Sequence, residues 1–145
     1  MTSLPSGFLS NVLNLQYALL YGPYLQSIPY GLFAGQTVLS IQGIALYQNP
    51  SLLALPNELF KGLAIGAVHF NFVFSGCSSL TAIPADICSY HPAATVFSNM
   101  FDGCVSLTGP APELWNRIPA PTNGTYCFRG CTGLSNYADI PAGWK

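Results

Sequence analysis

Residues 74–88 read FSGCSSLTAIPADIC, and residues 101–115 read FDGCVSLTGPAPELW. The two stretches place Phe, Gly, Cys, Ser, Leu and Thr at the same offsets, 27 residues apart. A sequence that repeats its apolar residues with a period of about 20 to 50 residues is typical of proteins built from stacked coils. These two stretches therefore predict a repeat architecture.

The same phase extends through the whole chain when Leu80 is used as a marker. Equivalent positions recur at intervals of 24 to 28 residues. A chain of 145 residues is long enough for one sizeable core. We therefore expect a single domain over residues 1–145. Its coils are predicted to begin near Met1, Leu25, Leu52, Leu80, Leu107 and Leu134.

Each repeat contains a short alternating segment followed by a polar or thiol side chain. In the clearest copy, Ile44 and Leu46 are expected to point inward from a strand that pairs in parallel with the next coil at ~4.8 Å. Asn or Cys then follows at a corner, where its side chain can bond main-chain groups that the turn leaves unpaired. The sequence predicts a structural ladder of such side chains, which are Asn49, Cys77, Cys104 and Cys131.

The phrase F-x-G-C-x-S-L-T-x-I-P resembles the BspA-like leucine-rich repeats of bacterial and phage surface proteins. The resemblance implies a curved, right-handed solenoid that serves adhesion or protein contacts and has no chemistry of its own. We accordingly expect an α/β-type repeat protein of mainly β character. Short parallel strands would line its concave side. Loops or short helical turns, such as residues 58–63, would form its convex side.

Composition narrows the classes of partner. Only 6% of the residues are charged, against about a quarter in an average soluble protein, so neighbouring molecules are expected to cover part of the surface. Two Lys and two Arg at a net charge of -1 give no basic patch for nucleic acid or anionic lipid. The sequence predicts other protein subunits as partners, in a homo- or hetero-oligomeric assembly, with a host-surface receptor as a further candidate.

The apolar N-terminal stretch does not predict membrane insertion. Residues 12–25 are interrupted by Asn14, Gln16, Gly22 and Pro23, so they lack the roughly 20 apolar residues of a membrane span. The basic start of a signal peptide is also missing. We expect a virion or extracellular surface location, reached without a signal peptide of its own.

The strand face is the predicted recognition surface, because alternation points every second side chain outward there. The first two strands contribute Gln16, Ala18, Leu20, Gly43 and Ala45 in this phase. The predicted protein-binding residues are Tyr47, Asn71, Val73, Ser75, Ser98, Met100, Asp102, Thr125 and Arg129. Such a weakly polar surface suits contact with another protein, and the alternative is that several of these residues simply face solvent.

Five Cys residues, with three at a spacing of 27, do not fit the closely paired ligands of a zinc site. We expect no metal site and a reduced, buried ladder. Cys127 is predicted to point outward from its strand, and Cys88 follows a corner. These two thiols are expected to be accessible and available for a bond with another chain.

Catalytic patterns are weak. No Ser or Cys nucleophile stands at a motif spacing from His69 or His91. Asp86 and Glu113 could form a carboxylate pair for glycoside hydrolysis, but their equivalent places in successive repeats explain them without catalysis. We expect neither an enzyme nor a cofactor.

Three hypotheses for function remain. The first is a structural and recognition module that mediates protein-protein contacts in a bacteriophage virion, as a tail fibre or decoration protein. The second is a bacterial cell-surface adhesin that binds host protein or glycan. The third, less favoured, is a glycan-cleaving enzyme that uses Asp86 and Glu113.

The ends of the stack carry apolar residues. At the N-terminal end, Leu4, Phe8, Val12 and Leu13 are expected to dock onto another subunit, unless residues 1–13 form their own cap. At the C-terminal end, a lid over the last coil is expected. It would be formed by Tyr137, Ile140, Pro141 and Trp144.

Overall fold

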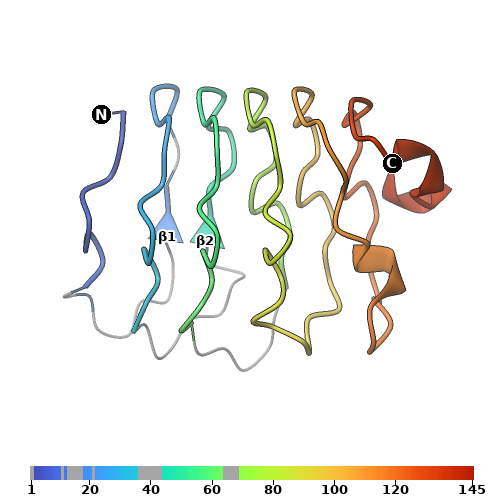
Figure 1. Ribbon diagram of the computed structural model, residues 1–145, viewed down its shortest axis with the longest axis horizontal. Helices are drawn as coiled ribbons and strands as arrows, with labels where there is room; N and C mark the ends of the chain where they lie inside the picture. The colour runs from blue at the N-terminus through green and yellow to red at the C-terminus, as the bar shows by residue number, and fades with distance from the viewer. Residues whose placement is uncertain (1, 11, 13–17, 21, 36–43, 64–68) are drawn as a thin grey trace.

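The computed structural model describes residues 2–10, 12, 18–20, 22–35, 44–63 and 69–145. Successive segments of the chain lie side by side along the longest axis of the molecule, from the N-terminus at one end to the C-terminus at the other (Figure 1). Most of the described chain is extended or turned. Its regular elements are the strands β1 (Ala18–Leu19) and β2 (Ile44–Ala45) and the 3-10 helices η2 (Leu114–Asn116), η3 (Tyr137–Asp139) and η4 (Ala142–Trp144).

Main-chain hydrogen bonds join equivalent residues of neighbouring coils. Strand β1 pairs in parallel with β2, so that Ala18 lies opposite Ile44. Further along the stack, the Phe74 N–H donates to the Met100 carbonyl at 2.9 Å and the Phe101 N–H to the Cys127 carbonyl at 2.8 Å. These parallel bonds stack one coil on the next.

A second set of bonds joins the coils just after the marker leucines. The Leu53 N–H donates to the Gln26 carbonyl at 3.0 Å, the Thr81 N–H to Leu53 at 3.2 Å, and the Thr108 N–H to Thr81 at 2.9 Å. Each coil is therefore tied to its neighbour at two places on its circumference. Many of the residues between these places form hydrogen-bonded turns, so long strands are not needed to hold the stack.

The core runs between the two sets of bonds. The marker residues Leu52, Leu80 and Leu107 are fully buried. Beside them the rings of Phe74 and Phe101 stack with centroids 5.3 Å apart, and those of Phe101 and Phe128 with centroids 5.7 Å apart. Burying each such side chain contributes about 1.5 to 3 kcal/mol, so the aromatic column is a main source of stability.

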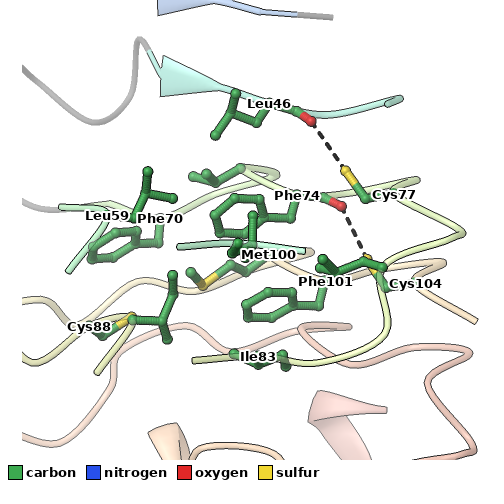
Figure 2. Packing of buried hydrophobic residues seen from close by; sticks show 14 of the residues in the cluster. Leu46, Leu59, Phe70, Phe74, Cys77, Ile83, Cys88, Met100, Phe101 and Cys104 are labelled. Atoms are coloured by element: carbon green, nitrogen blue, oxygen red, sulfur yellow. Dashed lines mark hydrogen bonds between the residues drawn. The ribbon is translucent and has the colours of Figure 1, made fainter. Parts of the chain in front are cut away.

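The predicted ladder residues lie in one column at the corner of the coils. The Asn49 amide donates to the Leu20 and Leu46 carbonyls at 2.6 and 2.7 Å. The Cys77 thiol donates to the Leu46 carbonyl at 3.2 Å, and the Cys104 thiol donates to the Phe74 carbonyl at 3.1 Å (Figure 2). Cys131 makes the same bond to Phe101 at 3.1 Å. Each side chain thus satisfies a carbonyl of the preceding coil.

The C-terminal residues lie over the last coil, as the sequence predicted. The Phe128 N–H donates to the Trp144 carbonyl at 2.7 Å, and the Tyr126 N–H donates to the Gly143 carbonyl at 3.0 Å. The Trp144 ring packs 6.2 Å from Phe97, and Ile140 is buried. Residues 141–145 therefore occupy the place of a further coil, although Pro141 itself is exposed.

The described N-terminal residues stack against the coil that contains Gln26. The Gln26 N–H donates to the Thr2 carbonyl at 2.7 Å, and Leu9 is buried. Leu4 and Val12 are half-buried against the core, whereas Phe8 is 43% exposed. Leu13 lies outside the described residues. Among the residues that are described, no helix has the length and apolarity needed to cross a bilayer.

Candidate interaction surface

The strand face does not follow the simple alternation that the sequence predicts. Phe72, Asn99 and Tyr126, at equivalent positions of three coils, have φ angles of 59°, 55° and 57°. A left-handed residue interrupts an extended backbone, so the in-and-out order of side chains cannot continue through it. The residue that follows each of them is turned inward instead.

This interruption overturns part of the predicted surface. Val73 and Met100 are fully buried, and Ser98 is only 9% exposed, so the prediction that these three residues face a partner is wrong. The Ser98 hydroxyl donates to the Asn71 side-chain oxygen at 2.8 Å, which satisfies it inside the molecule.

The left-handed residues take the exposed places. Phe72 is 51% exposed, Tyr126 is 44% exposed and Asn99 is half-buried. These three residues occupy the place that Ile44 holds in the clearest copy of the repeat, where an inward side chain is expected. Asn tolerates a left-handed backbone better than most residues, so among the three Asn99 alone could have indicated this conformation from the sequence.

The other predicted contact residues reach the surface to different degrees. Thr125 and Arg129 are exposed, and Tyr47, Asn71, Ser75 and Asp102 are half-buried. Gln16, Gly43 and the side chains of Ala18 and Ala45 lie outside the described residues, and Leu20 is half-buried. We call the resulting patch the strand-face surface, defined by Asn71, Phe72, Ser75, Asn99, Asp102, Thr125, Tyr126 and Arg129.

An ion pair orders one end of this surface. Arg129 contacts Asp102 through two nitrogens, Nε to Oδ1 at 2.8 Å and Nη2 to Oδ2 at 2.5 Å. Its guanidinium lies 4.6 Å from the centre of the Tyr126 ring. These contacts fix the aromatic ring and the charged group side by side.

The thiols predicted to be accessible are buried. Cys127 and Cys88 are free and at most 2% exposed, because Tyr126 turns the first inward and the core encloses the second. Burial raises the pKa of the Cys88 thiol to about 12. A bond from either thiol to another chain is therefore not open to the native protein. Within the described part of the chain, no three His, Cys, Asp or Glu side chains are grouped to hold a metal ion.

A second polar feature spans three coils on another part of the surface. Glu58 accepts hydrogen bonds from the hydroxyls of Tyr30 and Tyr90 and from Lys61 Nζ, the last at 2.8 Å. These hydrogen bonds lower the pKa of Glu58 to about 2. The bond from Lys61 has the largest effect, followed by those from Tyr30 and Tyr90. The Glu58 N–H in turn donates to Asp86 Oδ2 at 2.7 Å. We call Tyr30, Glu58, Lys61, Asp86 and Tyr90 the outer polar cluster. Sequence reasoning did not connect these residues.

Three of the four residues weighed for catalysis, Asp86, Glu113 and His91, have local hydrogen-bond partners. Glu113 is exposed and accepts a bond from Asn116 at 2.8 Å, while Asp86 belongs to the outer polar cluster. His69 is half-buried. His91 is buried with its Nε2 3.2 Å from the Phe60 carbonyl, and burial lowers its pKa. The structure thus gives each of these groups a place in the packing.

No family model, curated protein or solved structure matches this chain. Its function is therefore inferred from its own residues.

Proposed function

We propose that the chain is a right-handed leucine-rich-repeat solenoid and a non-enzymatic recognition module that contacts other proteins through its strand-face surface. The two sets of main-chain bonds between coils and the column of stacked Phe rings support the repeat class. The cysteines at one repeat position support it further.

The exposure of Phe72 and Tyr126 on one face carries the proposal of protein contact. Large aromatic side chains in water are costly, and aromatic residues and Arg are enriched at the centres of protein interfaces. Here the two rings lie at equivalent positions of the stack, and Arg129 packs on Tyr126. A partner that covers this surface would bury both rings and the ion pair.

The larger assembly that we favour is a bacteriophage virion, in which the chain would be a tail fibre or decoration protein. The low charge supports this choice, because a chain with only 6% charged residues is better suited to coverage by neighbours than to free solution. The alternative is a bacterial surface adhesin of the same repeat class, which would act as a monomer.

Light scattering over a dilution series tests the assembly. The expected result is a mass well above 15.5 kDa at micromolar concentration. The double variant Phe72→Ser/Tyr126→Ser is expected to shift the mass toward the monomer, because two interface aromatics are lost. Val105→Ser is the matched control, since Val105 is 59% exposed but lies outside the strand-face surface. A monomer at every concentration would argue for the adhesin and against the virion subunit.

A further inference from the structure

Asn123 and Gly124 form an Asn-Gly pair on the coil that the C-terminal lid covers. Asn123 is exposed, while its main chain is held in the stack. The Phe97 N–H donates to the Asn123 carbonyl at 2.7 Å, and the Asn123 N–H donates to the Thr95 carbonyl at 3.2 Å. A side-chain amide that precedes glycine can close a five-membered ring on the next peptide nitrogen, because glycine has no Cβ to obstruct the approach.

The nitrogen that would attack the amide is free of hydrogen bonds. In the part of the chain that the structure describes, the Gly124 N–H donates to no acceptor. The equivalent Phe97 N–H of the preceding coil donates to the Asn123 carbonyl, whereas the lid pairs with the N–H groups of Tyr126 and Phe128 and not with that of Gly124. A peptide nitrogen must lose its proton before it attacks, and here no hydrogen bond holds that proton.

The Asn123 amide is oriented for the attack. Its Oδ1 accepts the Thr125 N–H at 3.0 Å, which folds the side-chain carbonyl over the Gly124 peptide. Negative charge develops on Oδ1 when the nitrogen attacks Cγ, so the Thr125 N–H stabilises the intermediate as an oxyanion donor. A hydrogen bond to a charged oxygen is worth at least about tenfold in rate. The Asn123 Nδ2 donates to no described residue, and the side chain is open to solvent, so ammonia can leave.

No other Asn in the described ranges combines these features. Each is followed either by proline or by a residue whose N–H is already in a hydrogen bond. Asn49 precedes Pro50. The bonded N–H groups, which donate at 2.7 to 3.4 Å, belong to Glu58, Phe72, Met100, Arg117 and Tyr137. Asn136 gives the clearest contrast, because both polar atoms of its amide also bond the main chain of Ala111.

We propose that Asn123 is a site of spontaneous deamidation in the folded chain. The Gly124 nitrogen gives its proton to a base in the solvent and forms a bond to Asn123 Cγ. The bond from Cγ to Nδ2 then breaks, and Nδ2 leaves as ammonia. Water opens the five-membered ring at either of its carbonyls, which gives aspartate or isoaspartate at position 123. Water is the one co-reactant, and the formal net charge of -1 becomes more negative by one unit.

The two products are expected to affect the lid differently. Isoaspartate lengthens the main chain by one carbon directly before Gly124, which lies against the Trp144 ring. This product should loosen the lid bonds that start at Tyr126 and Phe128. Aspartate keeps the main chain and adds a charge beside Thr125 of the strand-face surface. Neither change requires a partner protein, so the site is independent of the proposed function.

Peptide mapping of the intact chain, aged in native buffer at pH 8 in water enriched in heavy oxygen, tests the site. Trypsin cleaves after Arg117 and Arg129, so Asn123 is the single Asn of peptide 118–129 and Asn136 the single Asn of peptide 130–145. Labelled aspartate and isoaspartate are expected in the first peptide at least about tenfold faster than in the second. The ratio should be larger in native buffer than in denaturant, because the hydrogen bonds that protect Asn136 exist only in the folded chain.

Variants separate the chemistry from its effect on the lid. Asn123→Gln keeps an amide but would need a six-membered ring, so its conversion is expected to stop. Hydrogen exchange of the Tyr126 and Phe128 amides should become faster in the isoaspartate fraction of the aged chain. It should stay unchanged in Asn123→Asp and in aged Asn123→Gln, which are the matched controls.

Conversion of Asn123 in denaturant without conversion in the folded chain over the same time would overturn the proposal, because the fold would then protect the amide. Equal rates at Asn123 and Asn136 in native buffer would overturn it as well. Both comparisons use the unaltered chain, so they do not depend on the folding of a variant.

Discussion

At the scale of single residues, the ladder thiols of Cys77, Cys104 and Cys131 join neighbouring coils. Each one donates its proton to a carbonyl of the coil before it. Burial raises the pKa of Cys77 to about 11 and that of Cys131 to about 12. Burial also raises the pKa of Cys104, and the neighbouring Cys77 and Cys131 raise it further. The protons that make these bonds therefore stay on sulfur at any physiological pH.

All five thiols are expected to resist modification in the native protein. The thiolate is the reactive form, and these thiols are both protonated and buried. An aromatic disulfide reagent at pH 8 should label none of them in buffer and all five in denaturant. Rapid labelling of Cys88 or Cys127 in buffer would contradict the burial of these two side chains.

A single carbon added at Gly124 is expected to destabilise the folded protein. A Cβ at this position would lie 1.9 Å from the Trp144 ring, so Gly124→Ala must displace the C-terminal lid. The expected cost is about 1 to 3 kcal/mol of unfolding free energy, measured by urea denaturation.

Gly143→Ala serves as the control for this prediction. Nothing lies within 4 Å of a Cβ at Gly143, so its effect should stay within about 0.5 kcal/mol. Equal stability of the two variants would mean that Trp144 does not pack against Gly124.

At the scale of elements, each interrupted strand segment combines two kinds of residue. The residue that precedes the buried pair is left-handed and faces outward, and the buried pair, such as Val73 and Phe74, then enters the core. A simple strand would bury only one of two successive residues. The interruption therefore gives each coil more core than its length would allow, and in two of the three coils, at Phe72 and Tyr126, it leaves an aromatic residue on the surface.

The loop that carries His91 makes stability depend on pH. His91 is buried, and burial lowers its pKa below the usual 6.5, with the nearby Arg117 adding to the effect and the bond to the Phe60 carbonyl opposing it. Above pH 6.5 the imidazole is neutral in both the folded and the unfolded chain. As the pH falls below 6.5, the unfolded chain takes up the proton more readily, so stability decreases.

Melting temperatures between pH 7.5 and 5.5 test this dependence. The native chain is expected to lose stability over this range, and His91→Phe is expected to lose less, because the group that titrates is gone. His69 is present in both proteins, so the difference reports on His91. The Glu58 carboxylate, with a pKa of about 2 against the usual 4.5, contributes above pH 4.5 and loses its contribution only as the pH falls further toward 2. Identical pH profiles for the native chain and His91→Phe would contradict the assignment of this pH dependence to His91.

At the scale of the whole molecule, the period of the sequence predicts which residues become neighbours. Leu52, Leu80 and Leu107 are buried in successive coils, and residues 137–144 lie over the last coil, as their apolar character indicated. Such predictions succeed because a repeat places like residues against like residues, whatever the local backbone does.

The local backbone and the outer surface could not be predicted in this way. Phe and Tyr rarely adopt a left-handed conformation, so the sequence does not predict one at Phe72 or Tyr126. The stacked coils impose this conformation on both residues. In the outer polar cluster, Tyr30, Glu58 and Asp86 follow one another at intervals of 28 residues, as the period requires. Tyr90 escapes the period, because it lies 32 residues from Glu58 and the two meet only through the shapes of two different turns. The strand-face surface and the place of Tyr90 in the outer polar cluster therefore required coordinates.

The stacking of equivalent residues is the claim on which the rest depends, and aromatic contacts in solution test it most directly. In NMR spectra of a chain with selectively labelled phenylalanines, the Phe101 ring is expected to show nuclear Overhauser cross peaks to both Phe74 and Phe128, whose ring centres lie 5.3 and 5.7 Å away. Phe74 and Phe128 should show none to each other, because Phe101 lies between them. A direct cross peak between Phe74 and Phe128, or none from Phe101 to either, would contradict the stacked coils.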